Sequence, residues 1–383
     1  MTTWQHQLIP LKTLASGDQL HLALYTITSP HPGPQVYLQS SMHAAELQGQ
    51  GVLFHLMQFL AHHDFCGTIQ IIAPANPLGA QQKILTHTLG RFNFLTGNNW
   101  NRNYLDLKEH LNFSFSSFVQ QHRQDRPEDM KAAFKQAYAQ ALQDFLANPY
   151  GISDEQKLAV ILQSYACKAD IVIDLHNAWA GTYYLYATED DPYAKAWGIP
   201  FIIRLPYHFA GALDEASFMP WYHLAQACAA EGRPLKFDFA SYTVELASEE
   251  SFSFAQSQQD LAYLLRYLAA RGVVAPEDVP PLGPADGKIW ESKLCHFKTY
   301  YAPQAGLIDF KVAPGTIVAP HDVLAQYLTW PSVDATATPV FAPVEQAAIK
   351  ARQAAVVLNH ANSNLAQEGQ MIIQVLENLR PVN

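Results

Sequence analysis

The sequence predicts an α/β protein with a large N-terminal domain and a smaller β-rich C-terminal domain. Strand and helix patterns alternate over the first part of the chain, and the nearly continuous apolar run at 170–176 is typical of a central strand buried on both faces. Prolines then cluster at 276–284, as in an interdomain linker. Because 383 residues exceed a single typical core, we place the domains at 1–283 and 284–383.

The N-terminal part begins with a strand, helix, strand order. Residues 20–27 and 35–39 have strand character, with a Pro-Gly loop at 29–34 between them. Apolar residues from Leu47 to Leu60 then recur at helical spacing, and 68–74 is a β-rich run that leads into a turn sequence at 76–79. This order predicts a βαβ unit.

A helical insertion at about 107–168 interrupts the strand pattern, and residues 130–146 read as an amphipathic helix within it. Further strands are expected at 170–176, 200–205 and 242–246, followed by a helix around 261–268. All of these elements belong to the predicted large domain.

Composition excludes several classes of protein. The net charge of −10 argues against a nucleic-acid partner, since phosphate backbones are held mainly by Lys and Arg. The N-terminus lacks the pattern of a signal peptide, and no run approaches the length of a membrane span, so we expect a cytoplasmic protein without a membrane partner. The four scattered cysteines are expected to be reduced, buried and structural.

An imidazole and a carboxylate stand three residues apart in Ser41-Met42-His43-Ala44-Ala45-Glu46, where a strand is predicted to turn into a helix. In a first helical turn, His43 and Glu46 would share one face and converge on one ion. A zinc site needs at least three protein ligands. Taken alone, the pair is more typical of a buried histidine beside a glutamate that interacts with the helix dipole.

Two further strand ends carry residues of the required type. His176 is the last residue of the 170–176 run, and Glu245 lies in the 242–246 strand. Burying a carboxylate in an apolar strand costs free energy unless the group is paired or has a function. In an α/β sheet the carboxyl ends of the strands share one edge. Two histidines and one carboxylate there would leave a zinc position for water, and a further carboxylate would take the proton.

The ordered motifs resemble those of the succinylglutamate desuccinylase/aspartoacylase family, which belongs to the zinc carboxypeptidase-like fold, a mixed sheet flanked by helices. They are His43-x-x-Glu46, Asn76-Pro77-x-Gly79, Asn101-Arg102, Asp174-x-His176-Asn177 and Thr243-x-Glu245. The similarity covers roughly residues 35–330.

The resemblance implies a role for each matching residue. It implies that His43, Glu46 and His176 hold one Zn²⁺ per chain and that Glu245 is general base and then acid. It also implies that Asn101 and Arg102 bind the substrate carboxylate, and that Arg91 polarises the scissile carbonyl. Asp174, two residues before His176 on the same strand face, would either bond that histidine or bond the backbone.

Three departures from the family pattern leave the substrate open. Ala44-Ala45 replaces the usual Gly-Asn, Trp100 stands where Leu is common, and Asn103-Tyr104 follows Arg102 in place of Val-Phe-Pro-Gly. Trp100 and Tyr104 would form an aromatic wall for a bulkier substrate or be core residues that anchor the loop.

The C-terminal domain carries a weak internal repeat, in which 301–308 is echoed by 341–348. It resembles the barrel-sandwich shape of biotinyl and lipoyl domains. The turn at 329–336 contains no lysine, which excludes a swinging arm. We expect a wall of the cleft or a contact in a homo-oligomer, and the competing interpretation makes 344–357 an Ala-rich helix.

These observations predict a zinc-dependent amidohydrolase or deacylase that cleaves a small N-acyl amino acid or similar amide. One alternative is a zinc carboxypeptidase acting on peptides, with Arg102 binding the terminal carboxylate. Another is a non-catalytic member of the fold that uses the cleft to bind a ligand.

Overall fold

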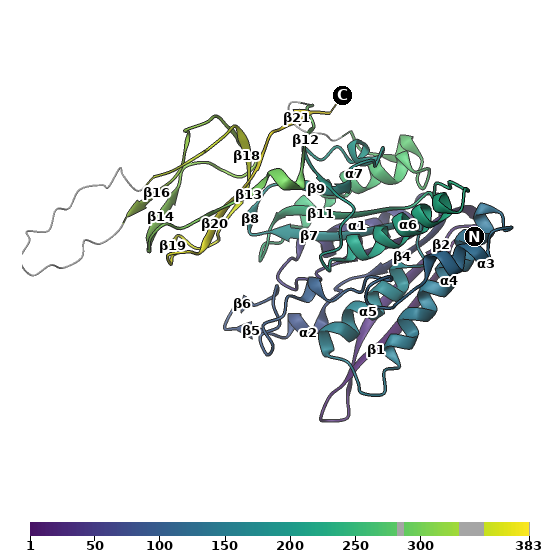
Figure 1. The fold of residues 1–383 in the computed structure, drawn as a ribbon. Coiled ribbons are helices and arrows are strands. Elements are labelled where there is room, and N and C mark those ends of the chain that lie inside the picture. The colour runs from purple at the N-terminus through teal and green to yellow at the C-terminus, as the bar shows by residue number, and fades with distance from the viewer. Residues whose placement is uncertain (282–286, 329–347, 383) are drawn as a thin grey trace, which may run out of the picture.

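A ten-stranded mixed sheet organises the chain in the computed structural model, which describes residues 1–281, 287–328 and 348–382 (Figure 1). Its order is β1-β2-β4-β3-β7-β11-β9-β10-β12-β21. The strands are β1 (Thr3–Thr13), β2 (Gln19–Thr28), β4 (Cys66–Ile72), β3 (His31–Ser40), β7 (Ile171–Ala178), β11 (Ala240–Ser248), β9 (Tyr184–Thr188), β10 (Phe201–Leu205), β12 (Trp290–Lys293) and β21 (Arg380–Pro381). The predicted α/β class and mixed sheet are confirmed.

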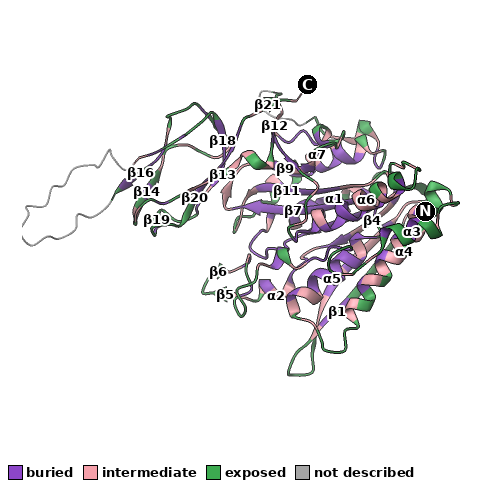
Figure 2. Cartoon of the chain, in the orientation of Figure 1, coloured by how far each residue is buried: buried purple, intermediate pink, exposed green. Residues whose placement is uncertain are grey.

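Four parallel strands form the centre of this sheet. β3 pairs with β4 and β7, and β7 pairs with β11, all in parallel. Every residue of β7 is buried, as Figure 2 shows in purple for the middle of the sheet. The parallel pairing brings the carboxyl ends of β3, β7 and β11 to one edge, as expected for a βαβ unit.

Helices cover both faces of the sheet. α1 (Gln48–Leu60) and α7 (Phe254–Ala270) pack against each other on one face. α5 (Asp154–Ala166) and α6 (Leu213–Ala230) lie on the other, with α3 (Phe115–Gln121) and α4 (Pro127–Leu146) packed outside them (Figure 1). Short helical turns are α2 (Pro77–Ala80), η1 (Trp100–Arg102), η2 (Ala194–Trp197), η3 (Pro276–Asp278) and η4 (Leu294–His296).

The segment of the predicted helical insertion contains α3, α4 and α5. α4 begins with Pro127 in its first turn, where a missing N–H costs nothing, and has acidic residues beside it. Met130, Phe134, Tyr138 and Leu142 are its buried residues, spaced four apart on one face.

Two local expectations need correction. The predicted Pro-Gly loop at 29–34 is shorter, because β3 already begins at His31 and its pairing with β4 is irregular between His31 and Gln35. Cys295 is exposed rather than buried, and Cys66 is only partly buried, whereas Cys167 and Cys228 are buried; all four are free.

The C-terminal part is β-rich, as predicted. One sheet has the order β13-β20-β18-β15, and a second has the order β17-β16-β14-β19. The strands are β13 (Phe297–Tyr301), β14 (Gly306–Phe310), β15 (Ile317–Val318), β16 (Val323–Leu328), β17 (Ile349–Lys350), β18 (Ala355–His360), β19 (Leu365–Ala366) and β20 (Met371–Glu377). The alternative Ala-rich helix is wrong over 348–357, and its first residues and the turn at 329–336 lie outside the described part.

Strand pairing joins the two parts. β12 and β21 both belong to the large sheet, although they follow the predicted boundary at 283/284. The short strand β8 (Ala180–Gly181), just after β7, pairs with β18. The C-terminal part is therefore held beside the carboxyl end of β7, while the exact domain boundary stays a prediction.

No helix within the described ranges is both long and apolar enough to cross a membrane.

Candidate metal centre

The His43–Glu46 segment is a tight turn and not the first turn of a helix, because α1 begins only at Gln48. The Glu46 N–H donates to the His43 carbonyl at 3.0 Å, which folds the two side chains toward each other. His43 Nδ1 lies 2.9 Å from Glu46 Oε1. The predicted helical placement is thus wrong, but the three-residue spacing still brings the two groups together.

Asn76 fixes this turn from the side. Its side-chain amide donates to the Met42 carbonyl at 2.9 Å, and its Oδ1 accepts from the Gly79 N–H at 2.7 Å to cap α2. Ser41, with φ of 61°, reverses the chain at the end of β3. The Asn-Pro-x-Gly motif therefore serves to position the turn.

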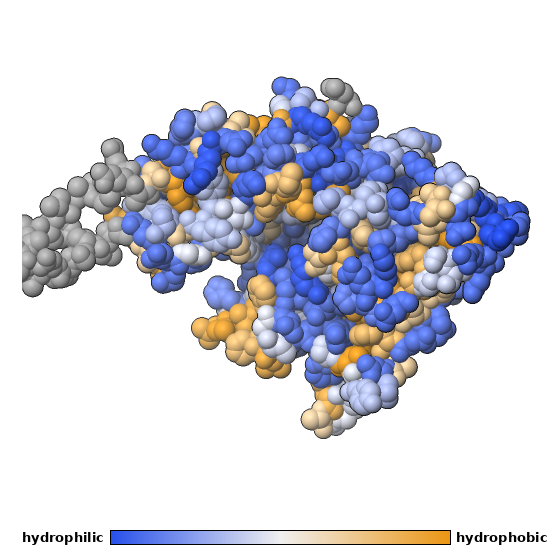
Figure 3. Space-filling view, in the orientation of Figure 1, coloured by the Kyte–Doolittle hydropathy of each residue, from blue (hydrophilic) through white to orange (hydrophobic). Residues whose placement is uncertain are grey.

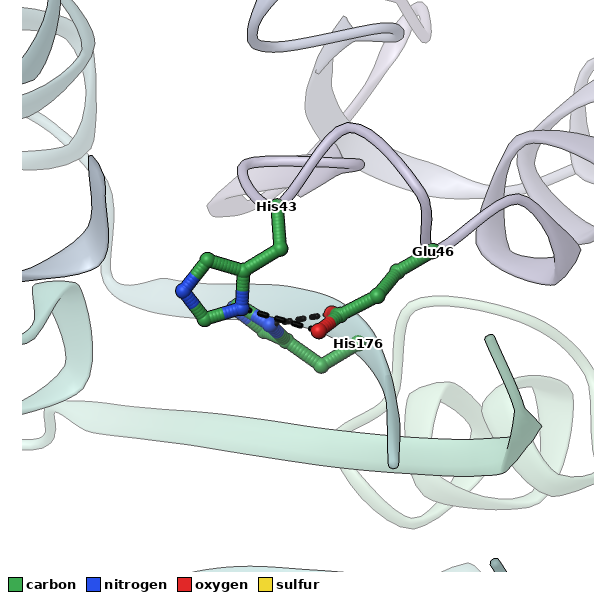
Figure 4. Close-up of side chains that lie close together, drawn as sticks. All are labelled: His43, Glu46 and His176. Carbon is green, nitrogen blue, oxygen red and sulfur yellow. Dashed lines mark hydrogen bonds and ion pairs between the residues drawn. The ribbon is translucent and has the colours of Figure 1, made fainter. Parts of the chain in front are cut away.

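His176, at the end of β7, completes a cluster with His43 and Glu46 (Figure 4). His176 Nδ1 lies 2.7 Å from Glu46 Oε2, and the Asn177 N–H donates to the same oxygen at 3.0 Å. One ligand atom from each of the three buried residues lies within 4.8 Å of the others. The convergence predicted from sequence is present.

Both imidazoles turn the same nitrogen toward Glu46. His43 Nε2 lies 3.0 Å from Asn99 Oδ1, which must be an acceptor because it also takes the Asn101 N–H at 2.9 Å. His176 Nε2 lies 2.9 Å from the Asp174 carboxylate, which can only accept. These acceptors favour a proton on each Nε2, so that Nδ1 is the nitrogen of each ring that would bind an ion in place of its own proton. Two imidazole nitrogens and a carboxylate are a donor set that fits Zn²⁺.

The charges at the cluster are strongly coupled. Burial opposes a charged His176, but the carboxylates of Asp174 and Glu46 outweigh it and raise the pKa of this imidazole well above its usual value. Burial lowers the pKa of His43 to about 4. Burial opposes a charged Glu46 as well, yet the two imidazoles hold its pKa well below its usual value. The site is thus built around a carboxylate that attracts a cation.

Glu245 stands beside the cluster with a free oxygen. Its Cα is the register partner of His176 between β11 and β7. The residue is only 8% exposed, and its Oε2 has no hydrogen-bond partner among the described residues. Burial, and then the charge of Glu46, raise the pKa of this carboxyl to about 8. A buried, unpaired carboxyl of this kind is able to accept and return a proton.

The predicted arginines occupy different positions. Arg91 Nη2 donates to Glu46 Oε1 at 3.1 Å, so this guanidinium touches the cluster itself. Arg102 is exposed, and its Nη1 donates to the Asn101 carbonyl at 2.7 Å. Asn101 is buried, with its Nδ2 3.5 Å from His176 Nε2. The Asn101–Arg102 pair therefore extends from the cluster to the surface.

Trp100 and Tyr104, which flank this pair, are core residues. They are 1% and 2% exposed and pack in the hydrophobic core with Met42 and Leu213. The structure thus supports the anchoring role and not the aromatic wall.

Several residues at the site escaped sequence reasoning. Asn99, Gln39 and Glu249 carry no motif that distinguishes them from loop or strand residues. Glu249 accepts a hydrogen bond of 2.9 Å from Asn362 Nδ2 of the C-terminal part. Burial and the charge of Glu46 raise the pKa of Glu249 to about 7 against the opposing effect of Arg91. The C-terminal part therefore contacts a carboxylate whose pKa depends on the charge of Glu46.

The surface is hollowed between the C-terminal part and the hairpin formed by β5 (Lys83–Ile84) and β6 (His87–Thr88) (Figure 3). Apolar side chains gather on the hairpin. Ile84 and Leu85 are exposed there. The hairpin ends three residues before Arg91, and β8 begins four residues after His176. The hollow is thus bordered by elements that adjoin the cluster in sequence.

Comparison with known proteins is consistent with this geometry. The family model "Succinylglutamate desuccinylase/Aspartoacylase catalytic domain" matches residues 32–271. A family protein from Shewanella amazonensis is 31% identical with a TM-score of 0.89, over 99% of this chain and 100% of the other. One from Shewanella frigidimarina is 33% identical with a TM-score of 0.90, over 100% and 99%.

A more distant structure shares the fold alone. The product-bound ectoine utilization protein EutE (DoeB) from Ruegeria pomeroyi is 17% identical with a TM-score of 0.62, over 98% of this chain and 95% of the other. No curated protein matches the sequence significantly. With its catalytic-domain match over 32–271 and a His-Glu-His cluster at the end of the central strands, the chain belongs to the succinylglutamate desuccinylase/aspartoacylase family.

Proposed function

We propose that this protein is a zinc-dependent deacylase that hydrolyses the amide bond of a small N-acyl amino acid. The observation that carries the proposal is the convergence of His43, Glu46 and His176 beside the unpaired Oε2 of Glu245. The family, whose members are hydrolases of the desuccinylase and aspartoacylase type, supports the same reaction class.

His43 Nδ1, His176 Nδ1 and a Glu46 oxygen would hold the ion. When bound, Zn²⁺ supplies Lewis acidity, lowering the pKa of a water and polarising a carbonyl. Three protein ligands leave room for water and substrate. Asn99 and Asp174 hold the two imidazoles in the orientation that the ion requires.

Glu245 acts as the proton carrier. Its Oε2 takes a proton from the attacking water and gives it to the leaving amine as the C–N bond breaks. The second proton of the water also passes to the amine, so that the products are a carboxylate and an ammonium group. A cation bound by His43, Glu46 and His176 would place a positive charge near the Glu245 carboxyl. Because an opposite charge favours the ionised form, the pKa of this carboxyl would fall from about 8 toward neutrality.

The two arginines have different roles. Arg91, which already contacts Glu46, lies close enough to the cluster to stabilise the negative oxygen that develops on the scissile carbonyl. Arg102 and Asn101 would bind the carboxylate of the amino acid, with the exposed guanidinium at the entrance to the site.

The proposal is tested by incubating the zinc-loaded protein with a panel of N-acyl amino acids and short peptides and measuring free amine. Glu245→Gln, which keeps the shape and removes the proton acceptor, is the matched control. We expect turnover of at least one N-acyl amino acid by the wild type. Cleavage of peptides alone would identify a carboxypeptidase instead, and no cleavage at full zinc occupancy would identify a binding protein.

A further inference from the structure

A buried chain of hydrogen bonds runs behind His176, and Gln39 is at its centre. Gln39 lies on β3 and is fully buried, and its Cα is the register partner of Asp174 on β7. Gln39 Nε2 donates to Asp174 Oδ2 at 2.9 Å. The same carboxylate oxygen receives His176 Nε2 at 2.9 Å. A single side chain therefore separates Gln39 from a proposed metal ligand.

The chemistry of the neighbours fixes the orientation of the Gln39 amide. Asp174 only accepts, so Gln39 must present its NH₂ group to it. The opposite end, Oε1, accepts from the Tyr37 hydroxyl at 3.0 Å. The second N–H of the amide is then directed to the Tyr104 hydroxyl, 3.2 Å away. Each polar atom of the amide has a partner, so Gln39 has one favoured orientation.

Tyr104 connects this series of hydrogen bonds to the segment that contains Asn101 and Arg102. It follows Arg102 by two residues and is 2% exposed, so its ring is fixed in the core. The link from Gln39 to the segment therefore depends on the Tyr104 hydroxyl.

We infer that Gln39 is a positioning residue that couples the Asn101–Arg102 segment to His176 through Tyr104 on one side and Asp174 on the other. The inference rests on the proposed function for the roles of His176 and Arg102. Two sites that bias the same rigid element influence each other equally in free energy. Zinc held by His176 and a carboxylate held by Arg102 should therefore change each other's binding free energy by the same amount.

Burial makes the network sensitive to the loss of one partner. Asp174 is 1% exposed, and its Oδ1 already has no hydrogen-bond partner among the described residues. Replacing Gln39 by Met, of similar size, removes a donor from this carboxylate and leaves it free to shift. Tyr104→Phe removes only the hydroxyl and leaves the ring in the core.

The test compares Gln39→Met and Tyr104→Phe with a control variant, Tyr242→Phe. Tyr242 is 1% exposed, and its hydroxyl donates to Asp191 at 2.6 Å. This hydroxyl bonds outside the Gln39 network. Three quantities are measured for each variant: the Kd for Zn²⁺ by competition with a chelator, kcat and KM for the best N-acyl amino acid, and unfolding in urea.

We expect Gln39→Met to weaken Zn²⁺ binding about tenfold, the lower end of the effect of residues that orient metal ligands. It should also raise KM, and the effect of substrate on zinc affinity should become smaller. Tyr104→Phe should raise KM with little change in Zn²⁺ affinity when no substrate is present. Tyr242→Phe should lower stability without moving Kd or KM.

The inference is overturned if Gln39→Met and Tyr104→Phe alter only stability, as the control does. If no substrate is turned over, the proposed function fails, but the zinc Kd still tests the Asp174 side of the network. Amide hydrogen exchange of residues 99–104, with and without Zn²⁺, then tests the loop side. A zinc-dependent protection that is smaller in Tyr104→Phe than in the wild type supports the coupling. An equal zinc dependence of the protection in the two proteins refutes it.

Discussion

His176 and Glu245 are register partners on the adjacent parallel strands β7 and β11, so a proposed metal ligand and the proposed base start from neighbouring backbone positions. Strand pairing of this kind holds reacting groups more rigidly than loops do. Their side chains leave the sheet at the same edge, beside the turn that carries His43 and Glu46. The relationship explains how residues about seventy positions apart in the sequence form one site.

The first prediction concerns the metal ligands. We expect one zinc per chain in the wild type and loss of that zinc in His176→Ala, because two remaining ligands cannot close the site. Elemental analysis of the purified proteins measures this. His55→Ala is the control, since His55 is a buried histidine bonded to the Phe254 carbonyl at 3.2 Å and is not part of the cluster. Full occupancy in His176→Ala would refute the ligand assignment.

The second prediction concerns the base. Glu245→Gln should retain zinc and lower turnover by about two to four orders of magnitude, because the amide cannot accept the proton. Initial rates at saturating substrate, normalised to zinc content, provide the measurement. A variant within a few-fold of the wild-type rate would mean that another group carries the proton.

The third prediction concerns the substrate carboxylate. Because Arg102 is exposed in the structure, an amidated substrate would not leave a fully buried cation, and the penalty is smaller than for a broken buried pair. We expect a loss of about 1.5 to 3 kcal/mol, typical of hydrogen bonds to charged groups. kcat/KM on paired acid and amide substrates measures it.

Arg102→Ala should abolish this discrimination, whereas Arg91→Ala should mainly lower kcat, since Arg91 contacts the cluster. Arg126→Ala, which removes an exposed arginine paired with Glu128 and Asp129, is the control. Equal rates of the wild type on the acid and the amide would show that Arg102 is not a carboxylate clamp.

The fourth prediction concerns stability and pH in the presence of a chelator. Burial raises the pKa of Glu245 from 4.5 to about 8, so folding favours its protonated form. The stability that this group contributes is present in full below pH 4.5 and is lost as the pH rises through about 8. The free energy of unfolding in urea should therefore fall from pH 5 to pH 8.5, and fall less in Glu245→Gln. An equal slope in both proteins would contradict the raised pKa.

Sequence predicted the centre of the fold better than its edges. The runs at 35–39, 170–176 and 242–246 are continuous enough to identify β3, β7 and β11, and their carboxyl ends point to the site. β1 was not predicted, because Thr3–Thr13 is mostly exposed and lacks a buried apolar run. The His43–Glu46 turn was taken for helix, since a three-residue spacing suits both conformations.

Sequence predicted the residues of the candidate site that stand in local motifs, but not the contacts between residues far apart in the chain. His43, Glu46 and His176 stand in recognisable motifs. The contacts of Gln39 with Tyr104 and of Glu249 with Asn362 join residues separated by 65 and 113 positions. Such pairs depend on how the strands and the C-terminal part come together, which no local pattern specifies. The exposure of Arg102 likewise follows from the conformation of η1 and could not be read from its motif.

Anomalous scattering from a zinc-loaded crystal would show whether His43, Glu46 and His176 form the metal centre. We predict one strong zinc peak about 2.0 to 2.2 Å from both Nδ1 atoms and from a Glu46 oxygen. A peak at the Nε2 atoms, or at other residues with the cluster left empty, would contradict the account.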